Sequence, residues 1–398
     1  MKSNITNINV HVLNYSVGVK AFEFLNSMLQ SKEPEFKQTV SVTVSEKKLK
    51  KNNDTTVDIL FVSMPKMLTV NVDDYDLVVF SNADEPLQVA SDIIIKNIHK
   101  KNCYLISNSL LTKNHALYDS VIHSSHDLLI CHQYWTNPVY PQYYSLPELS
   151  KNNCRDKDLF FINGANRSWR HHFLTLLDKE KITFSLKSSI SAESIIHETN
   201  DAPWETTEDA EFRMTLNDMY PITRNTPTSY YDDSIQVGIC TGFELEGLDN
   251  KTTKMPPGYF ILPEYYQYKC IIFPETAWQN NELSITEKSL KCFYAESIPW
   301  PVGGANINRL YNQIGFKTAW NLLPENLKEY DQELDHFKRY EKHVTAIKWM
   351  QHNLNVLSSP AAETIRKENK QKFLDNNISQ MTAEQLWDAI KNNTKNKL

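Results

Sequence analysis

The chain of 398 residues has little glycine, nine residues in all, and no apolar run near the roughly 18 residues that a membrane span needs. Its first residues, MKSNITNINVHVLNY, mix polar and apolar side chains, so we expect neither a cleaved signal peptide nor a membrane span. No G-x-G-x-x-G segment follows a strand-like run, which disfavours a nicotinamide-dependent dehydrogenase. We therefore expect a cytoplasmic protein.

The cysteines and histidines are too scattered for a disulfide framework or a metal site. None of the six cysteines forms a C-x-x-C pair, so we predict buried, reduced thiols. Two histidine pairs, His123 with His126 and His171 with His172, lack further clustered ligands. A D-x-D triplet at residues 74–76 comes before its strand, whereas an ion would have to sit after one. We predict no metal and no other cofactor.

The charge balance is slightly acidic, with 42 Lys and Arg against 48 Asp and Glu. A net charge of −6 argues against binding to nucleic acid by bulk electrostatics. One strongly basic run, KKLKK at residues 47–51, could line a local groove, although a solvated loop explains it equally well.

In the predicted first domain, residues 1–150, the first 135 residues alternate between strand-like and helix-like segments. The strand-like segments, such as DLVVF at residues 76–80, are short and nearly continuous in apolar residues, and a helix is predicted from about Leu87 to Lys100. Apolar strands separated by helices are typical of a parallel sheet covered on both faces. We predict one α/β domain here, followed by a linker rich in proline and tyrosine.

The same alternation resumes over residues 151–335, which we predict to be a second α/β domain. Residues 336–398 are predicted to be a helical extension. Ser359 followed by Pro360 is typical of a helix start, and Thr382 with Gln385 forms a capping-box pattern for a last helix.

Together these segments predict an α/β fold with two Rossmann-like domains that face a cleft, followed by C-terminal helices. Ligands of open parallel sheets bind beyond the carboxyl ends of the strands. We therefore expect the chemistry of the chain to lie in that cleft.

The segment Ser284-Ile285-Thr286-Glu287-Lys288 is the most informative motif. It places a hydroxyl, a carboxylate and an ammonium at the start of a predicted helix, where unpaired backbone N–H groups favour a phosphate. Glu287 could accept hydrogen bonds from ribose hydroxyls. The alternative is a plain capping box, Ser284 with Glu287, beside a solvated lysine.

Two further strand ends carry polar residues. Asn163 and Gly164 follow the strand-like run FFI, and Arg167 and Arg170 lie near the start of the next helix. The guanidinium group of arginine can donate paired hydrogen bonds to the two phosphates of a diphosphate, although both arginines could be surface charges. Glu275 follows the run CIIFP and could equally be a loop carboxylate.

The order of these motifs resembles the donor domain of GT-B glycosyltransferases. It is similar to the alpha-1,3-fucosyltransferase family, which has a T-E-K helix start followed by an apolar strand that ends in glycine, here PWPVGG. It also resembles related viral and bacterial glycosyltransferases, which carry an E-T segment, T-E-K, a glycine turn and a stretch that ends in G-F-K-T, here residues 310–318. A viral source would place the protein in the host cytoplasm.

The resemblance implies a metal-independent transfer of a sugar from a nucleotide-diphosphate sugar to an acceptor hydroxyl, with an inverting outcome. It implies that Lys288 and one of the two arginines contact the diphosphate and that Glu287 contacts the ribose. The donor-binding residues so predicted are Asn163, Gly164, Arg167, Arg170, Glu275, Thr286, Glu287 and Lys288.

An inverting transfer needs a base that deprotonates the acceptor. Asp84 and Glu85, just after the strand DLVVF, and His132, at the end of DLLICH, are the candidates in the first domain. The acceptor is a glycan or, if the source is a phage, a hydroxymethylated DNA base. Two other functions stay open: a nucleotide-sugar epimerase, and a non-catalytic protein that binds nucleotides or glycans.

Overall fold

The computed structural model describes part of the chain. The described residues are 7–13, 41–45, 48, 56–63, 70–82, 92–107, 109–113, 115–123, 135–136, 155–163, 168–182, 184, 186–189, 244–246, 252–254, 261, 264–275, 280, 282–375 and 377–394. They divide into two compact units. The first contains the strands up to residue 123 and the last helix, and the second contains the elements between residues 155 and 375.

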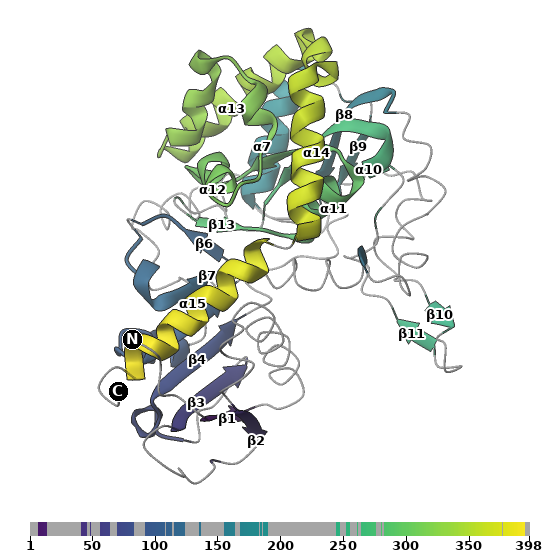
Figure 1. Cartoon of the computed structure of the whole chain (residues 1–398). Coiled ribbons are helices and arrows are strands. Elements are labelled where there is room, and N and C mark those ends of the chain that lie inside the picture. The colour runs from purple at the N-terminus through teal and green to yellow at the C-terminus, as the bar shows by residue number, and fades with distance from the viewer. Residues whose placement is uncertain are drawn as a thin grey trace. The chain divides into compact units, whose positions relative to one another are not determined.

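The first unit is built on a six-stranded sheet in the order β2-β1-β3-β4-β5-β7, in which all neighbours are parallel (Figure 1). Its strands are β1 (Asn7–Leu13), β2 (Ser41–Ser45), β3 (Thr56–Ser63), β4 (Leu77–Asn82), β5 (Cys103–Ser107) and β7 (Val121–His123). The short strand β6 (Ser109–Leu111) and the 3-10 turns η1 (Val72–Asp74) and η3 (Tyr118–Ser120) connect them.

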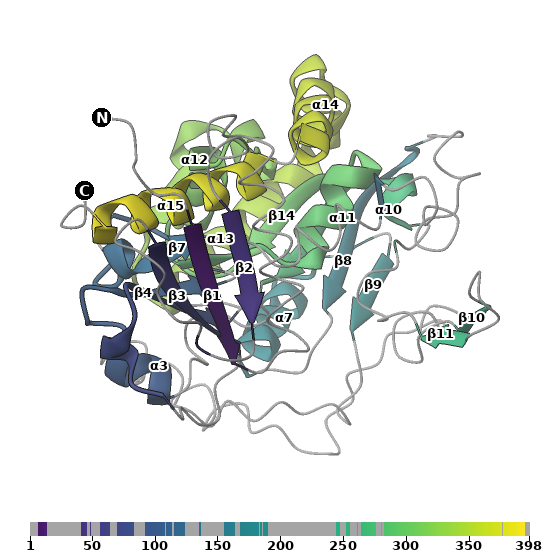
Figure 2. The same ribbon diagram turned by 60° about the horizontal axis from the view of Figure 1, so that its bottom comes forward.

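Both faces of this sheet are covered. Helix α15 (Asn377–Thr394) packs Trp387 and Ile390 against one face, together with Val10, and Figure 2 shows it running across the strands. Helix α3 (Asp92–Asn97) packs Ile94 against the other face. Because β-strand side chains alternate between faces, a strand buried on both sides must be apolar almost throughout, as the sequence pattern predicts.

The second unit is built on a parallel sheet in the order β14-β12-β8-β9. Its strands are β8 (Lys157–Asn163), β9 (Leu186–Ser189), β12 (Tyr268–Pro274) and β14 (Ile298–Val302). Short strands β10 (Glu244–Glu246) and β11 (Thr252–Lys254) form an antiparallel pair, and β13 (Glu282–Ser284) precedes α11.

Helices again cover the two faces of this sheet. Helices α7 (Ser168–Lys179) and α13 (His336–His352) share a core with Phe161 and Trp300, and α10 (Glu264–Gln267) places Tyr265 against Phe160 on the other face. The remaining elements are α11 (Glu287–Ala295), α12 (Ile307–Gln313), α14 (Pro360–Asp375), η5 (Ala319–Leu322), η6 (Glu325–Gln332) and η7 (Leu354–Ser358).

The predicted α/β class, with parallel sheets and C-terminal helices, is confirmed, whereas the predicted cleft and domain boundaries stay predictions. Helix α14 begins at Pro360, as predicted, and the amide of Ala362 donates to the Ser359 hydroxyl at 3.2 Å. The capping box at Thr382 is wrong, because α15 begins at Asn377 and Thr382 lies inside it. In the part of the chain that the structure describes, no helix combines the length and the apolar character needed to cross a bilayer.

Candidate diphosphate site

Two buried polar residues mark the carboxyl edge of the second sheet. Asn163 ends β8, and Glu275 comes directly after Pro274 at the end of β12. The two strands are parallel neighbours, so their ends meet at the same edge. Asn163 is 1% exposed and Glu275 is 0% exposed. A polar side chain buried this completely needs hydrogen-bond partners, and these partners define the site.

Arg170, on α7, joins the two strand ends. Its Nη2 donates to the backbone carbonyl of Glu275 at 3.0 Å, and its Nη1 approaches Oδ1 of Asn163 at 3.4 Å. The guanidinium is 1% exposed and therefore belongs to the interior of the unit. Its observed contacts anchor the backbone that carries Glu275. The alternative that Arg170 is a surface charge is wrong.

The carboxylate of Glu275 accepts hydrogen bonds from three hydroxyl groups. Thr286 Oγ1 donates to Oε2 at 2.9 Å, while Ser289 Oγ at 2.8 Å and Tyr311 OH at 2.9 Å donate to Oε1. The Ser289 and Tyr311 hydroxyls also contact each other. We call these four residues the Glu275 network. Glu275 lies just after β12, outside regular secondary structure, and its carboxylate is held by these three hydroxyls.

The Glu275 network includes two residues that the sequence analysis missed. Ser289 lies in the first turns of α11 and Tyr311 on α12, and both are completely buried. Nothing in the local sequence distinguishes them from other core positions of a helix. Their partner is 14 residues away for Ser289 and 36 for Tyr311, so only the tertiary structure reveals the contact.

Helix α11 begins as predicted, but its N-cap differs from the capping-box alternative. The N-cap is Thr286, with φ −101° and ψ 170°, so Ser284 with Glu287 does not form the capping box. The Thr286 side chain makes no capping hydrogen bond with the helix, because its hydroxyl is directed to Glu275. The buried Ser284 hydroxyl has no hydrogen-bond partner among the described residues. Neither the Thr286 hydroxyl nor the Ser284 hydroxyl therefore caps the start of α11.

Lys288 supplies the positive charge at this helix start. Its Nζ lies 3.1 Å from Oε1 of Glu287, and the two side chains are 11% and 24% exposed, respectively. An ammonium in this place adds a full charge to the partial positive charge of the helix N-terminus. The two together favour a bound anion.

The carboxylates of the site differ in their titration. Burial raises the pKa of Glu275 above its usual range, against the opposing effects of the Lys288 charge and the three hydroxyl donors. Burial acts in the same direction on Glu287, but the charges of Lys288 and Lys291 outweigh it and hold the pKa of Glu287 below its usual range. Glu287 therefore carries its negative charge at neutral pH.

The structure brings together six of the predicted site residues in the second unit: Asn163, Arg170, Glu275, Thr286, Glu287 and Lys288. The other five lie outside the described residues: Asp84, Glu85, His132, Gly164 and Arg167. Their roles stay predictions.

No family model and no curated protein matches the chain. Two solved structures are distant neighbours. A crystal structure of alpha1,3-fucosyltransferase has 13% sequence identity and a TM-score of 0.39, covering 94% of this chain and 92% of that one. Another, of alpha1,3-fucosyltransferase with GDP-fucose, has the same identity and TM-score, covering 92% of this chain and 82% of that one. A TM-score this low assigns neither fold nor function, so the function must be inferred from the residues of the site.

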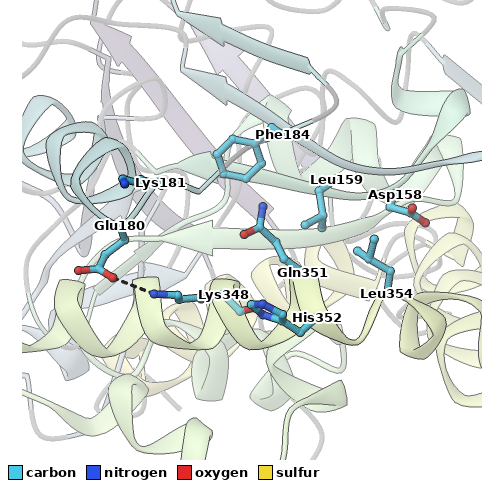
Figure 3. A pocket seen from close by; sticks show the side chains of 9 residues that line it. All are labelled: Asp158, Leu159, Glu180, Lys181, Phe184, Lys348, Gln351, His352 and Leu354. Atoms are coloured by element: carbon cyan, nitrogen blue, oxygen red, sulfur yellow. Dashed lines mark hydrogen bonds and ion pairs between the residues drawn. The ribbon is translucent and has the colours of Figure 1, made fainter.

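A concavity with a volume of about 570 Å³ lies at the opposite, amino edge of the second sheet. Asp158, near the amino end of β8, and Phe184 line it, and Figure 3 shows the ion pair between Glu180 and Lys348 beside them, at 3.0 Å. Within the described residues, no group of three or more His, Cys, Asp or Glu side chains is arranged to hold a metal ion.

Proposed function

We propose that the chain is a metal-independent glycosyltransferase that takes a sugar from a nucleotide-diphosphate sugar. The observation that carries the proposal is the start of α11, where Lys288 lies beside a helix N-terminus whose N-cap hydroxyl is engaged elsewhere. Unpaired N–H groups and a fixed ammonium are the groups that stabilise a diphosphate. The order of motifs, which resembles the donor domain of GT-B glycosyltransferases, gives this anion site a substrate.

In the proposed reaction, negative charge develops on the diphosphate as the bond from the anomeric carbon to the phosphate oxygen breaks. Lys288 and the α11 amides are in place before the reaction, so they stabilise that charge without reorganisation. Glu287, which is ionised, would accept hydrogen bonds from the ribose hydroxyls of the nucleotide.

The acceptor side of the proposal rests on residues outside the described part of the chain. We propose an inverting transfer in which Asp84, Glu85 or His132 removes the proton of the acceptor hydroxyl as that oxygen attacks the anomeric carbon. The acceptor is a glycan hydroxyl or the hydroxyl of a hydroxymethylated DNA base. Each candidate is replaced by alanine in turn, and kcat/KM is measured as a function of pH. The substitution that removes the base should lower kcat/KM and abolish the acid limb of the profile.

Calorimetric titration with GDP, UDP, CDP and dTDP tests the donor site, and transfer from the matching sugar nucleotides tests the activity. The variant Lys288→Ala should bind the preferred diphosphate more weakly and lower kcat/KM about 100-fold or more, because the leaving group loses its cationic partner. Lys370→Ala is a matched control, since Lys370 pairs with Glu296 just beyond the other end of α11, at 2.5 Å. Equal kcat/KM values in wild type and Lys288→Ala would refute the site.

Incubation with donor alone separates the proposal from its rivals. A transferase leaves the sugar nucleotide intact or hydrolyses it slowly, whereas an epimerase converts it into a second sugar nucleotide. Binding of a nucleoside diphosphate without turnover of any donor, with glycan and hydroxymethylated DNA acceptors both present, would favour a non-catalytic binding protein.

A further inference from the structure

The Glu275 network ties three elements of the second unit to one point. Glu275 follows β12, Thr286 and Ser289 belong to the start of α11, and Tyr311 belongs to α12. Thr286 and Ser289 lie on either side of Lys288 in the sequence, two residues before it and one after it. The carboxylate therefore holds the first turn of α11 on both sides of the residue that supplies the charge.

Helix α12 has a buried anchor of its own. Asp331 Oδ1 accepts hydrogen bonds from the backbone amide and the side-chain amide of Asn308, both at 2.9 Å, and its Oδ2 accepts from the amide of Arg309 at 3.2 Å. Asp331 and Asn308 are completely buried. The Tyr311 hydroxyl therefore comes from a helix that is itself fixed, so it provides Glu275 with a rigid donor.

Hydroxyl donors determine which form of Glu275 the protein favours. An ionised carboxylate accepts hydrogen bonds at both oxygens, and here all three hydroxyls donate to it. Among the described residues, the other groups near Glu275 that carry or can carry charge are Lys288, with its partner Glu287, Cys292 on α11, and Arg170 on α7. Donors and cations stabilise the ionised form, whereas burial opposes it.

We propose that the buried carboxylate of Glu275 is a positioning group that fixes the first turn of α11 for the diphosphate, with Tyr311 as a second positioning residue. The inference rests on the proposed function and adds two roles to it. Glu275 is completely buried and occupied by hydroxyls, so it acts through α11 instead of touching the donor. Because the Thr286 hydroxyl donates to Glu275, it does not cap the first turn of α11.

The variant Tyr311→Phe tests this role without changing any charge. It keeps the ring that packs edge-on against Phe293, with 6.2 Å between centroids, and removes only the hydroxyl. Tyr330→Phe is the matched control, since Tyr330 is also buried in this unit and its hydroxyl faces Asn308 at 3.4 Å instead of Glu275. Ser289→Ala repeats the test from α11 should Tyr311→Phe fold poorly.

We expect Tyr311→Phe to lower kcat about tenfold at neutral pH, with the donor KM within about twofold of wild type, the pattern of a lost transition-state interaction. Loss of a donor to the ionised carboxylate should also move the acid limb of the kcat profile to higher pH. Tyr330→Phe should change neither quantity. Equal kcat values and equal acid limbs for Tyr311→Phe and Tyr330→Phe would overturn the proposal.

A measurement without substrate separates this inference from the proposed function. In protein with ¹³C-labelled glutamate, the infrared band that is missing in Glu275→Gln reports the pH at which Glu275 takes up a proton. That pH should rise in Tyr311→Phe and stay unchanged in Tyr330→Phe, and an unchanged value in both would refute the network. If the infrared shift is found but no donor is turned over by wild type, the proposed function fails, and with it the role of the network in catalysis.

Discussion

Among the side chains whose burial the structure describes, the two parallel sheets differ in where the polar ones are buried. In the second unit the buried polar residues Asn163 and Glu275 lie at the carboxyl ends of their strands and lead to the start of α11. In the first unit Asn9 and Asp58 lie in the first half of β1 and β3 and bind each other at 3.0 Å.

The polar groups of the first sheet serve the sheet itself. The amide of Asp58 donates to Asp76 Oδ2 at 3.0 Å, and His11 contacts the hydroxyl of Tyr75, so these residues fix the segment that leads into β4. The polar groups of the second sheet instead fix the start of α11, where we propose that the diphosphate binds. Both sheets are parallel, and the position of their buried polar groups along the strands distinguishes them.

The largest expected loss of stability follows from a change at the ends of β8 and β12, where Arg170 binds both strands. Arg170→Met should lower the free energy of unfolding of the second unit by about 2–4 kcal/mol, because two buried acceptors lose their donor. Urea unfolding measures the change, with Lys179→Met, an exposed substitution on the same helix, as the control. A loss no larger than that of the control would mean that Arg170 does not hold the strand ends together.

Acid should destabilise the second unit through His343. Burial lowers the pKa of His343 to about 3, and Trp300 Nε1 donates to its Nε2 at 2.6 Å, which requires the neutral ring. The unfolded chain has the higher pKa, near 6.5, so it binds more protons between pH 6.5 and 3, and the stability present above pH 6.5 is lost as the pH falls. The loss at pH 5 should be about 2 kcal/mol.

His343→Gln sharpens this prediction, because glutamine keeps an acceptor for Trp300 but does not titrate. In His343→Gln, the difference in unfolding free energy between pH 7 and pH 5 should be smaller than in wild type by about 2 kcal/mol. His352→Gln, at an exposed position, should leave the difference unchanged. An undiminished acid loss in His343→Gln would refute the assignment.

A smaller effect is expected in the first sheet. Asp58→Ala should lower its stability by about 1–2 kcal/mol, because the buried amide of Asn9 loses its acceptor. Hydrogen exchange of β1 and β3 amides measures the loss. Pyrophosphate binding should stay as in wild type, and weaker binding would contradict the different roles assigned to the two sheets.

The smallest effect is expected at the concavity of Figure 3. Lys348→Met removes an exposed ion pair with Glu180, and such pairs contribute about 0–1 kcal/mol. Thermal unfolding should change by less than about 2 °C, with no change in pyrophosphate affinity. A large loss of affinity would place the anion site at the amino edge of the sheet and would invert the comparison.

The sequence was sufficient for elements whose signals are local. Runs such as FFI and CIIF predict buried parallel strands because both faces must be apolar, and Ser359 with Pro360 predicts a helix start because a cap and a fixed φ act within one turn. The T-E-K segment likewise predicts the start of α11.

The sequence was insufficient where a residue has a distant partner. The sequence places Thr286 at a helix start but does not show that its hydroxyl donates to Glu275, and Tyr311 resembles any core residue of a helix. The capping box predicted at Thr382 is wrong for a related reason. The residues before Thr382 also fit a helix, so α15 begins earlier, at Asn377, and Thr382 lies inside it.

Helix α15 has a consequence for how the protein is made. Its Trp387 and Ile390 complete the core of a sheet whose strands were all synthesised before residue 124. Val10, Phe61 and Val79 belong to this core. They are synthesised while more than half of the chain, including α15, is still to be translated. A chain that ends after α14 would lack α15 and should expose this apolar face of the first sheet, so we expect it to bind chaperones.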